Sequence, residues 1–188
     1  MNKKWLGIFA ALAVVLTIVW AISSHTGSKV ALDDSPALRS RDDVSDVHYI
    51  DDEAIALSGE IHNSAAVIAE ATAAHALVNK QRASNGLPAL AWDNALSQAA
   101  QVRAQECQQV FSHTRPDGTD WWTVNSDIMF GENLAKGYDT AGDVVEAWMN
   151  STTHRAAILN GEFTTAGIAI FQGSDGTWYW AENFGIDE

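Results

Sequence analysis

The sequence is poor in cysteine and in basic residues, and both shortages limit what the protein can be. Its 188 residues include one cysteine, Cys107, which excludes an intramolecular disulfide framework and a multi-cysteine zinc site. Lys and Arg number 11 against 24 Asp and Glu, giving a net charge of -13. Because binding to phosphates needs a surplus of basic side chains, we expect no nucleic-acid partner. A hydrophobic fraction of 47% indicates a folded protein with one domain.

Charged residues are absent from residues 5–22, which read WLGIFAALAVVLTIVWAI and follow Lys3 and Lys4. A basic start before an apolar run is typical of a signal peptide, or of a membrane anchor with a cytoplasmic N-terminus. The run is long for a cleaved signal, lies at the lower limit for a membrane span, and is followed by only a weak cleavage site. We therefore predict that residues 1–22 are a signal anchor rather than a signal peptide. The remainder is then extracellular, membrane-anchored or secreted.

Residues 23–60 lack aromatic side chains except Tyr49 and show little helical or strand periodicity. They carry nine acidic and three basic side chains, a balance of -6. Such a segment buries too little surface to offset the entropy cost of ordering it. No D-x-[DN]-x-[DN]-G pattern indicates a calcium loop. The sequence thus predicts an acidic flexible tether over residues 23–60 and a globular domain over residues 61–188.

Helical patterns occupy the first part of this domain. Asn63 or Ser64 is positioned to cap a helix that ends at Asn85-Gly86, and Asp93 to cap a second one. Thr140 or Asp143 opens a third helix, and Ser151 or Thr152 a short fourth. The second helix has an apolar stripe at spacings of three and four, which predicts one buried face formed by Leu96, Ala99, Ala100, Ala104 and Cys107.

The C-terminal part changes to a strand pattern. Residues 167–171 and 177–181 are rich in β-branched and aromatic side chains and are separated by Gly173-Ser174-Asp175-Gly176. This arrangement predicts a β-hairpin with a short glycine-bounded loop. Helices followed by strands indicate an α+β domain in which helices pack on a sheet.

Candidate chemistry lies in three clusters that contain His113, Glu132 and His154. Two imidazoles and a carboxylate could bind a divalent ion such as zinc, or act as a general acid and base. No H-E-x-x-H motif supports a compact metal site, and no G-x-S-x-G motif supports a serine nucleophile. Taken one at a time, His113 is better explained as a hydrogen-bonded loop histidine, and His154 as a helix-cap histidine that bonds the backbone. Cys107 is expected to be a buried small hydrophobe, and Trp121-Trp122 to place one ring in the core and one at its rim.

Together, these clusters resemble a known family. The segments SHTRPDG, GENLA, the W-x-x-S-x-x-H-R run and WAENFG occur here in the order seen in CAP domains. The CAP superfamily, also called SCP domains, comprises cysteine-rich secretory proteins, antigen 5 and pathogenesis-related 1 proteins. The segment ALVNKQRASNGLPALAWDNALSQAA is similar to the start of the domain in its bacterial branch. The resemblance covers residues 74–185, nearly all of the predicted domain.

The resemblance implies an α-β-α sandwich with a cavity lined by two histidines and two acidic residues. His113, Glu132 and His154 match three of these positions, and Ser151 stands where many members have the second glutamate. Any zinc bound by His113, His154 and Glu132 is therefore expected to bind weakly. Because the family's disulfides are absent, stability is expected to come from the core, notably from the side chains of Trp92, Trp148, Trp178 and Trp180.

Three functions remain open. The first, which we favour, is a non-enzymatic extracellular module that binds a small apolar ligand or a cell-envelope component in its cavity, since lipid and sterol binding recur in the family. The second is a metal-assisted hydrolase that uses His113, Glu132 and His154. The third is a surface domain that presents loops to another protein. The missing second glutamate at Ser151 counts against the hydrolase.

Overall fold

The structure is a computed structural model that describes residues 30–35, 37–39 and 65–187. The predicted signal anchor, residues 1–22, lies outside the described residues, as does most of the predicted tether. Across the described ranges, no helix combines the length and the apolar character needed to cross a membrane.

A five-stranded sheet forms the centre of the domain. Its strands are β1 (Ala31–Leu32), β2 (Ala91–Trp92), β3 (Gly131–Lys136), β4 (Thr165–Gln172) and β5 (Trp178–Gly185), in the spatial order β1-β3-β5-β4-β2. All neighbours are antiparallel except β2 and β4. β4 and β5 form the predicted C-terminal hairpin, which is thereby confirmed.

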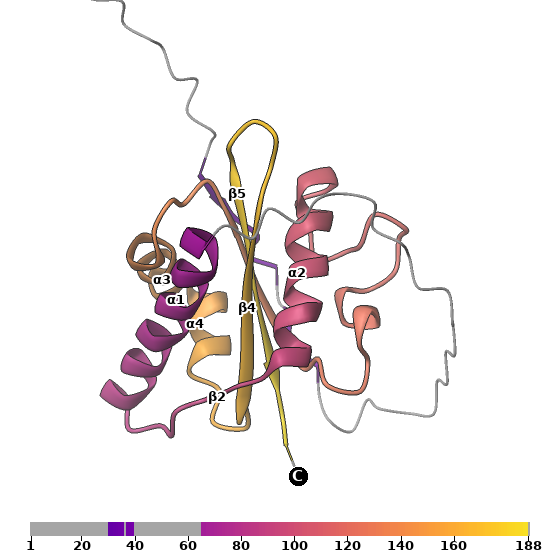
Figure 1. The fold of residues 1–188 in the computed structure, drawn as a ribbon. Helices are drawn as coiled ribbons and strands as arrows, with labels where there is room; N and C mark the ends of the chain where they lie inside the picture. Colours follow the sequence, from indigo (N-terminus) through magenta and orange to yellow (C-terminus); the bar gives the residue numbers. More distant parts are fainter. Residues whose placement is uncertain (1–29, 36, 40–64, 188) are drawn as a thin grey trace, which may run out of the picture.

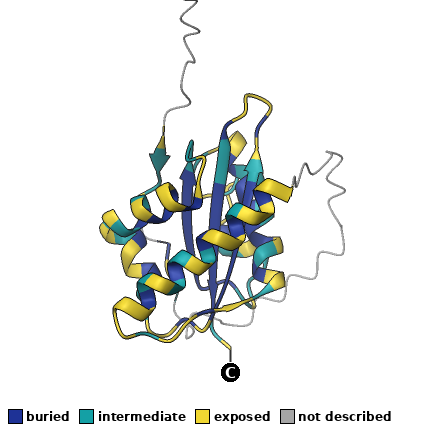
Figure 2. Ribbon diagram, turned by 60° about the vertical axis from the view of Figure 1, so that its left-hand side comes forward, coloured by how far each residue is buried: buried dark blue, intermediate teal, exposed yellow. Residues whose placement is uncertain are grey.

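Helices cover both faces of this sheet (Figure 1). The helices α1 (Ala65–Ser84), α3 (Ala141–Asn150) and α4 (Thr152–Ile158) lie on one face, and α2 (Asn94–Gln109) lies on the other. A single 3-10 turn, Trp121–Val124, follows α2 in the described chain. The strands are largely buried, whereas the helices turn an exposed side outward (Figure 2). The α+β class and the α-β-α sandwich predicted from the sequence are confirmed.

The helix boundaries follow from local capping. The Asp93 carboxylate accepts a hydrogen bond from the Leu96 N–H at 2.7 Å, and the Thr140 hydroxyl accepts one from the Asp143 N–H at 3.2 Å. Each bond satisfies a backbone donor that the first helical turn leaves free. Gly86, with φ of 77°, provides the left-handed residue that ends α1. Ser151 occupies the cap position of α4 but makes no capping bond with its side chain.

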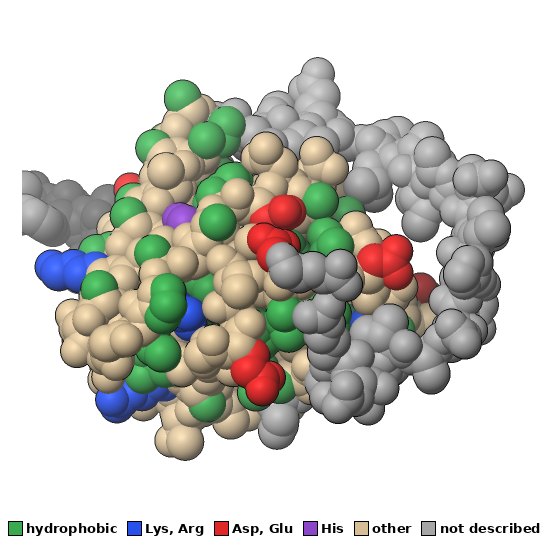
Figure 3. Space-filling model, turned by 90° about the horizontal axis from the view of Figure 1, so that it is seen from below, with side chains coloured by type: hydrophobic (Ala, Val, Ile, Leu, Met, Phe, Trp, Pro, Cys, Tyr) green, Lys and Arg blue, Asp and Glu red, His purple; other side chains and the backbone are tan. Residues whose placement is uncertain are grey.

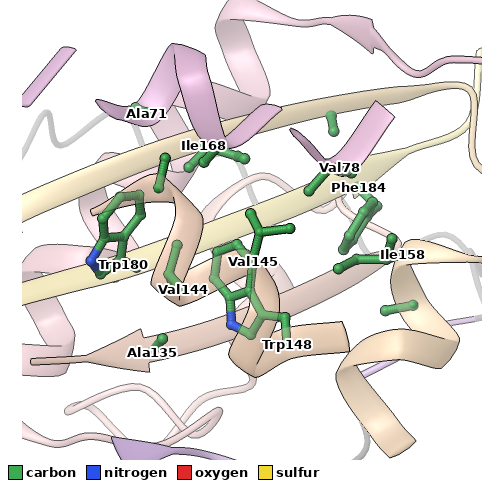
Figure 4. Close-up of a cluster of buried hydrophobic side chains, with 14 of the residues drawn as sticks. Ala71, Val78, Ala135, Val144, Val145, Trp148, Ile158, Ile168, Trp180 and Phe184 are labelled. Carbon is green, nitrogen blue, oxygen red and sulfur yellow. The ribbon is translucent and has the colours of Figure 1, made fainter. Parts of the chain in front are cut away.

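The larger hydrophobic core lies between the sheet and the helices α1, α3 and α4 (Figure 4). Trp148 and Trp180 are fully buried there and meet edge to face, with ring centroids 6.5 Å apart. Trp178 is only half-buried, and Trp92 is 37% exposed, so the prediction of Trp92 as a core residue is wrong. β2 is a two-residue edge strand, where the indole of Trp92 meets the ring of His75 edge to face and donates a hydrogen bond to Asn94 Oδ1 at 3.1 Å.

The opposite face of the sheet packs against α2. The predicted apolar stripe of α2 is buried as expected, and Arg103 is buried on the same helix. The helix approaches β4 so closely that a Cβ atom added to Gly167 would lie 2.1 Å from the backbone nitrogen of Ser97. Glycine is therefore required at residue 167 for the contact between α2 and the sheet.

Residues 30–39 differ from the prediction of a flexible tether. Ala31 and Leu32 pair with Lys136 and Ala135 of β3, and Leu38 forms a further bridge with Gly131. β3 would otherwise be an edge strand, with unpaired backbone groups that an extended segment can satisfy. This part of the predicted spacer is therefore bound to the sheet; we call residues 31–35 and 37–39 the strap.

The end of the domain where β5 finishes is seen in Figure 3. Its acidic side chains lie in separate groups among hydrophobic and uncharged ones. The charge of this face is thus dispersed rather than gathered into one patch.

Candidate functional site

The three residues predicted to carry chemistry lie close to β3. His113 follows α2, Glu132 is the second residue of β3, and His154 lies in α4. All three are buried, with exposed fractions of 8%, 2% and 2%. Glu132 points toward α2 because side chains alternate along a strand, whereas the next residue, Asn133, points toward α4. The fold therefore brings the predicted residues to the two sides of one strand.

Glu132 is held by a buried ion pair. Arg103 Nε donates to Glu132 Oε2 at 2.8 Å, and Arg103 Nη2 donates to Oε1 at 3.2 Å. His113 Nδ1 lies 2.8 Å from the same Oε1. Burial, the largest single effect, lowers the pKa of Arg103, but the charge and hydrogen bonds of Glu132 together with smaller contributions from Cys107 and Glu106 raise that pKa above its ordinary value. Both carboxylate oxygens of Glu132 are thus occupied by neighbouring side chains.

Sequence reasoning missed Arg103. The guanidinium also donates to the Ser112 carbonyl at 2.7 Å and to Glu106 Oε2 at 2.5 Å, so it connects α2 to the loop that carries His113. A signal was present, because residue 103 lies three and four positions from members of the predicted buried stripe. A basic residue on a buried helix face indicates a buried anionic partner.

His154 has a different environment. Its Nδ1 lies 2.8 Å from Ser151 Oγ and 3.3 Å from Asp34 Oδ1. The Ser151 hydroxyl donates to the same Asp34 oxygen at 2.5 Å, which explains why it does not cap α4. Burial lowers the pKa of His154, and the Asp34 carboxylate offsets only part of this effect. His154 Nε2 is buried without a hydrogen-bond partner in the described part of the chain.

The strap lies between the two histidines. The Asp33 carboxylate accepts a hydrogen bond from the backbone N–H of His113 at 3.1 Å, and the Asp33 carbonyl oxygen lies 3.4 Å from His113 Nε2. Asp34 reaches the His154 side as described above. The acidity of Asp33 and Asp34 predicts a place in the flexible tether, but both residues contact the domain.

The arrangement does not fit a zinc ion. Among the described residues, no three His, Cys, Asp or Glu side chains are placed so that they could hold a metal together. Glu132 already pairs with Arg103 and His113, and His154 bonds Ser151. Weak zinc binding by His113, His154 and Glu132 is a prediction from the sequence, and the positions of these side chains do not support it.

An open groove adjoins the strap. It has a volume of about 510 Å³, and its wall includes Leu32, Asp34, Tyr138, Asn150, Ser151 and Thr153. A second hollow of about 460 Å³ shares Tyr138 and Asn150 and continues past three acidic side chains, Asp139, Asp143 and Glu146. Of the predicted cavity residues, Ser151 lines the groove, whereas His113, Glu132 and His154 do not. Burial, together with the negative charge of Asp34, raises the pKa of Tyr138.

Two other expectations from the sequence are confirmed. Cys107 is 1% exposed, and burial raises the pKa of its thiol to about 12, so it behaves as a buried small hydrophobe. Trp121 is buried while Trp122 is half-buried, where the guanidinium of Arg39 lies 4.3 Å from the ring centroid. Cys107 therefore contributes no reactive thiol, and Trp121 and Trp122 do not form a bare aromatic platform.

Similarities to known proteins agree with this fold. The uncharacterized protein YkwD of Bacillus subtilis is 36% identical over 115 residues, which cover 57% of this chain and 44% of that protein. The chain therefore spans less than half the length of this relative.

Two solved structures share the fold. An extracellular protein of Bacillus anthracis that contains an SCP domain gives a TM-score of 0.58 at 24% identity, covering 64% of this chain and 41% of that one. An outer surface protein of Borrelia burgdorferi gives 0.57 at 22% identity, covering 64% and 94%. The profile of the cysteine-rich secretory protein family (CAP) matches residues 75–184, more than half of the chain. The protein belongs to the CAP family, in its bacterial branch.

Proposed function

We propose that the protein is a non-enzymatic extracellular module that binds a polar component of the cell envelope in the groove along α3. The ligand class is a glycan or peptide fragment that carries hydroxyl, amide and ammonium groups. The observation that carries this proposal is the chemistry of the groove wall, which combines hydroxyl, amide and carboxylate side chains.

The charge of the groove sets the preference among ligands. Asp34, Asp139, Asp143 and Glu146 contribute carboxylates, and among the described residues neither hollow has a Lys or Arg in its wall. Negative potential in a concave surface attracts cations and repels phosphate or other anionic headgroups. Tyr138 lies where the two hollows meet and offers a ring for stacking and a hydroxyl for hydrogen bonding. An amino sugar or an amine-bearing peptide suits this combination.

We propose this polar ligand in preference to the small apolar ligand that the family resemblance suggested. Sites for apolar ligands are lined mostly by hydrophobic and aromatic side chains. The groove wall combines the apolar groups of Leu32, Tyr138 and Ala147 with hydroxyl, amide and carboxylate groups of its other side chains. An apolar ligand would therefore leave hydroxyl and carboxylate groups without partners.

The hydrolase alternative has less support. General acid–base catalysis requires a group within hydrogen-bond reach of the substrate. His113 and Glu132 pair with each other beneath the strap, and Glu132 is also held by Arg103. Of the described histidines none lines the groove, and His154 lies behind its wall, where Nδ1 contacts the Ser151 hydroxyl.

The extracellular location is part of the proposal and is tested separately. If residues 1–22 anchor the chain with a cytoplasmic N-terminus, a protease added to intact cells removes the CAP domain. Digestion only after lysis would contradict an extracellular location. Release of the intact domain into the medium would indicate a secreted form.

Ligand binding is tested by calorimetry on the full chain with soluble cell-wall fragments. We expect binding to wild type and a loss of at least about tenfold in affinity for Tyr138→Ala, because the ring supplies contact area in the groove. Gln98→Ala, on the exposed side of α2, serves as the matched control and keeps wild-type affinity. Equal affinities of wild type and Tyr138→Ala would overturn the groove as the binding site.

A further inference from the structure

The strap is attached to the domain with little apolar burial. Among its described residues Ala37 is the buried one, whereas Leu38 is 50% exposed and the Asp34 side chain is 68% exposed. Burial of apolar surface supplies most of the free energy that holds a segment in place. The strap can therefore detach at a lower cost than the strands of the core.

Backbone pairing accounts for much of its attachment. Apart from the ladder at Ala31 and Leu32, the Glu132 N–H donates to the Ala37 carbonyl at 2.9 Å, and the Arg39 N–H donates to the Phe130 carbonyl at 2.8 Å. Any extended polypeptide offers the same donors and acceptors. The edge of β3 thus recognises an extended backbone, the geometry by which sheets take up an added strand.

Side-chain recognition is concentrated at two adjacent carboxylates. Asp33 and Asp34 lie between Leu32 and Leu38, the strap residues that pair with Ala135 and Gly131 of β3. The Asp33 carboxylate accepts the His113 N–H, and the Asp34 carboxylate accepts the Ser151 hydroxyl beside His154. Two consecutive acidic residues are thus bound by groups from separate elements of the domain.

The strap leaves part of this recognition unused. His154 Nε2 is buried and has no hydrogen-bond partner within the described ranges. His113 Nε2 has only a long contact of 3.4 Å to the Asp33 carbonyl. Unpaired buried polar groups cost free energy, so a segment that satisfies them would bind more tightly than the strap does.

We propose that the edge of β3, together with His113, Ser151 and His154, is a docking site for an extended polypeptide segment with two consecutive acidic residues. The strap is the intramolecular occupant of this site, and a partner segment displaces it by forming the same backbone pairs. This interaction goes beyond the proposed binding of an envelope component. Because Leu32 and Asp34 also form part of the groove wall, displacement of the strap would widen the groove.

The covalent connection of the strap determines how the site competes. A segment tethered to its own site has an effective concentration on the order of millimolar. A free peptide therefore binds wild type weakly and binds more tightly once the strap is weakened. This expectation distinguishes an occupied docking site from an inert edge strand.

The test uses a fluorescently labelled peptide with the sequence of residues 30–39, Val-Ala-Leu-Asp-Asp-Ser-Pro-Ala-Leu-Arg, and fluorescence anisotropy on the full chain. Arg39→Pro removes the N–H that donates to Phe130 and the guanidinium that donates to the Ser126 carbonyl at 2.6 Å. We expect this variant to bind the peptide at least about tenfold more tightly than wild type. A peptide with both aspartates replaced by asparagine should lose at least about tenfold in affinity.

A second variant and a control complete the design. Asp34→Ala removes a largely exposed side chain and should also increase peptide affinity, while near-ultraviolet circular dichroism verifies that both variants are folded. Gln98→Ala should behave as wild type. Failure of both folded variants to bind, or equal binding of the aspartate and asparagine peptides, would overturn the docking site. No envelope fragment enters this assay, so its failure leaves the proposed function standing, and the reverse also holds.

Discussion

Asp34 Oδ1 lies 3.3 Å from His154 Nδ1, so a carboxylate that precedes the CAP domain in the chain contacts a histidine buried within it. The Ser151 hydroxyl donates to the same oxygen at 2.5 Å. This contact shows that residue 151, which lacks a charge of its own, lies beside a carboxylate supplied by the strap. The boundary of the folded unit thus extends to residue 30 within the described chain.

The buried pair of Arg103 and Glu132 gives the first prediction. Arg103→Met leaves the Glu132 carboxylate buried without its cation, and we expect a loss of about 3–5 kcal/mol in the free energy of unfolding. The double variant Arg103→Met, Glu132→Leu should recover most of that loss, because no uncompensated charge remains. Urea denaturation of wild type, both single variants and the double variant measures the coupling. Additive losses would contradict it.

Glu182 gives a prediction of pH dependence. This carboxyl is fully buried, and burial raises its pKa to about 8 from an ordinary 4.5, against smaller opposing effects of Asn133 and Arg82. The folded state therefore holds a proton that the unfolded state loses between these two values, so the stability from Glu182 falls as pH rises from 4.5 through 8. The stability of Glu182→Gln relative to wild type should rise over this range, by about 1.4 kcal/mol for each pH unit. Urea denaturation midpoints of both proteins at several pH values test this prediction. A difference between the two midpoints that does not change with pH would contradict it.

His154 gives a dependence of the opposite sign. Burial lowers its pKa below the ordinary value of 6.5, so just below that value the unfolded state binds the proton and the folded state does not. Stability from His154 is therefore present above about 6.5 and is lost as pH falls toward the folded pKa. His154→Gln should show a shallower loss of thermal stability between neutral pH and about pH 5.5 than wild type. Parallel slopes would show that the imidazole does not titrate as stated.

Cys107 is expected to resist thiol reagents. Its side chain is 1% exposed, and burial raises its pKa to about 12, so little thiolate is present or accessible at neutral pH. A disulfide reagent should label the protein only on unfolding, at the rate of global opening. Labelling of native protein as fast as that of a free thiol in solution would contradict the buried position.

The two tryptophans Trp148 and Trp92 should differ sharply. Trp148→Ala removes a fully buried indole and should destabilise the fold by about 3–5 kcal/mol. Trp92→Ala removes a side chain that is 37% exposed at an edge strand, and we expect about 1 kcal/mol or less. Thermal unfolding of the two variants makes the comparison, and comparable losses would contradict the burial difference.

Much of the fold was predictable from local sequence signals. Asp93 and Thr140 cap helices where the sequence placed them, and the hairpin turns at Gly173–Gly176 between two strand-forming segments. Cap bonds, turn conformations and helical stripes connect residues a few positions apart, so the sequence contains both partners of each interaction. The motifs around His113, Glu132 and His154 likewise contain residues that lie beside β3, with His113 and Glu132 on one side of the strand and His154 on the other.

The tertiary structure decided which of these residues contact one another. The sequence does not show that Arg103 neutralises Glu132, that Trp92 lies at an exposed edge, or that Asp33 and Asp34 enter from the predicted tether. Each depends on groups far apart in the chain and on backbone donors and acceptors that exist only once β3 has formed an edge. The prediction that residues 23–60 form a spacer rests on their side-chain composition alone. The strap is held largely through its backbone, which composition does not describe.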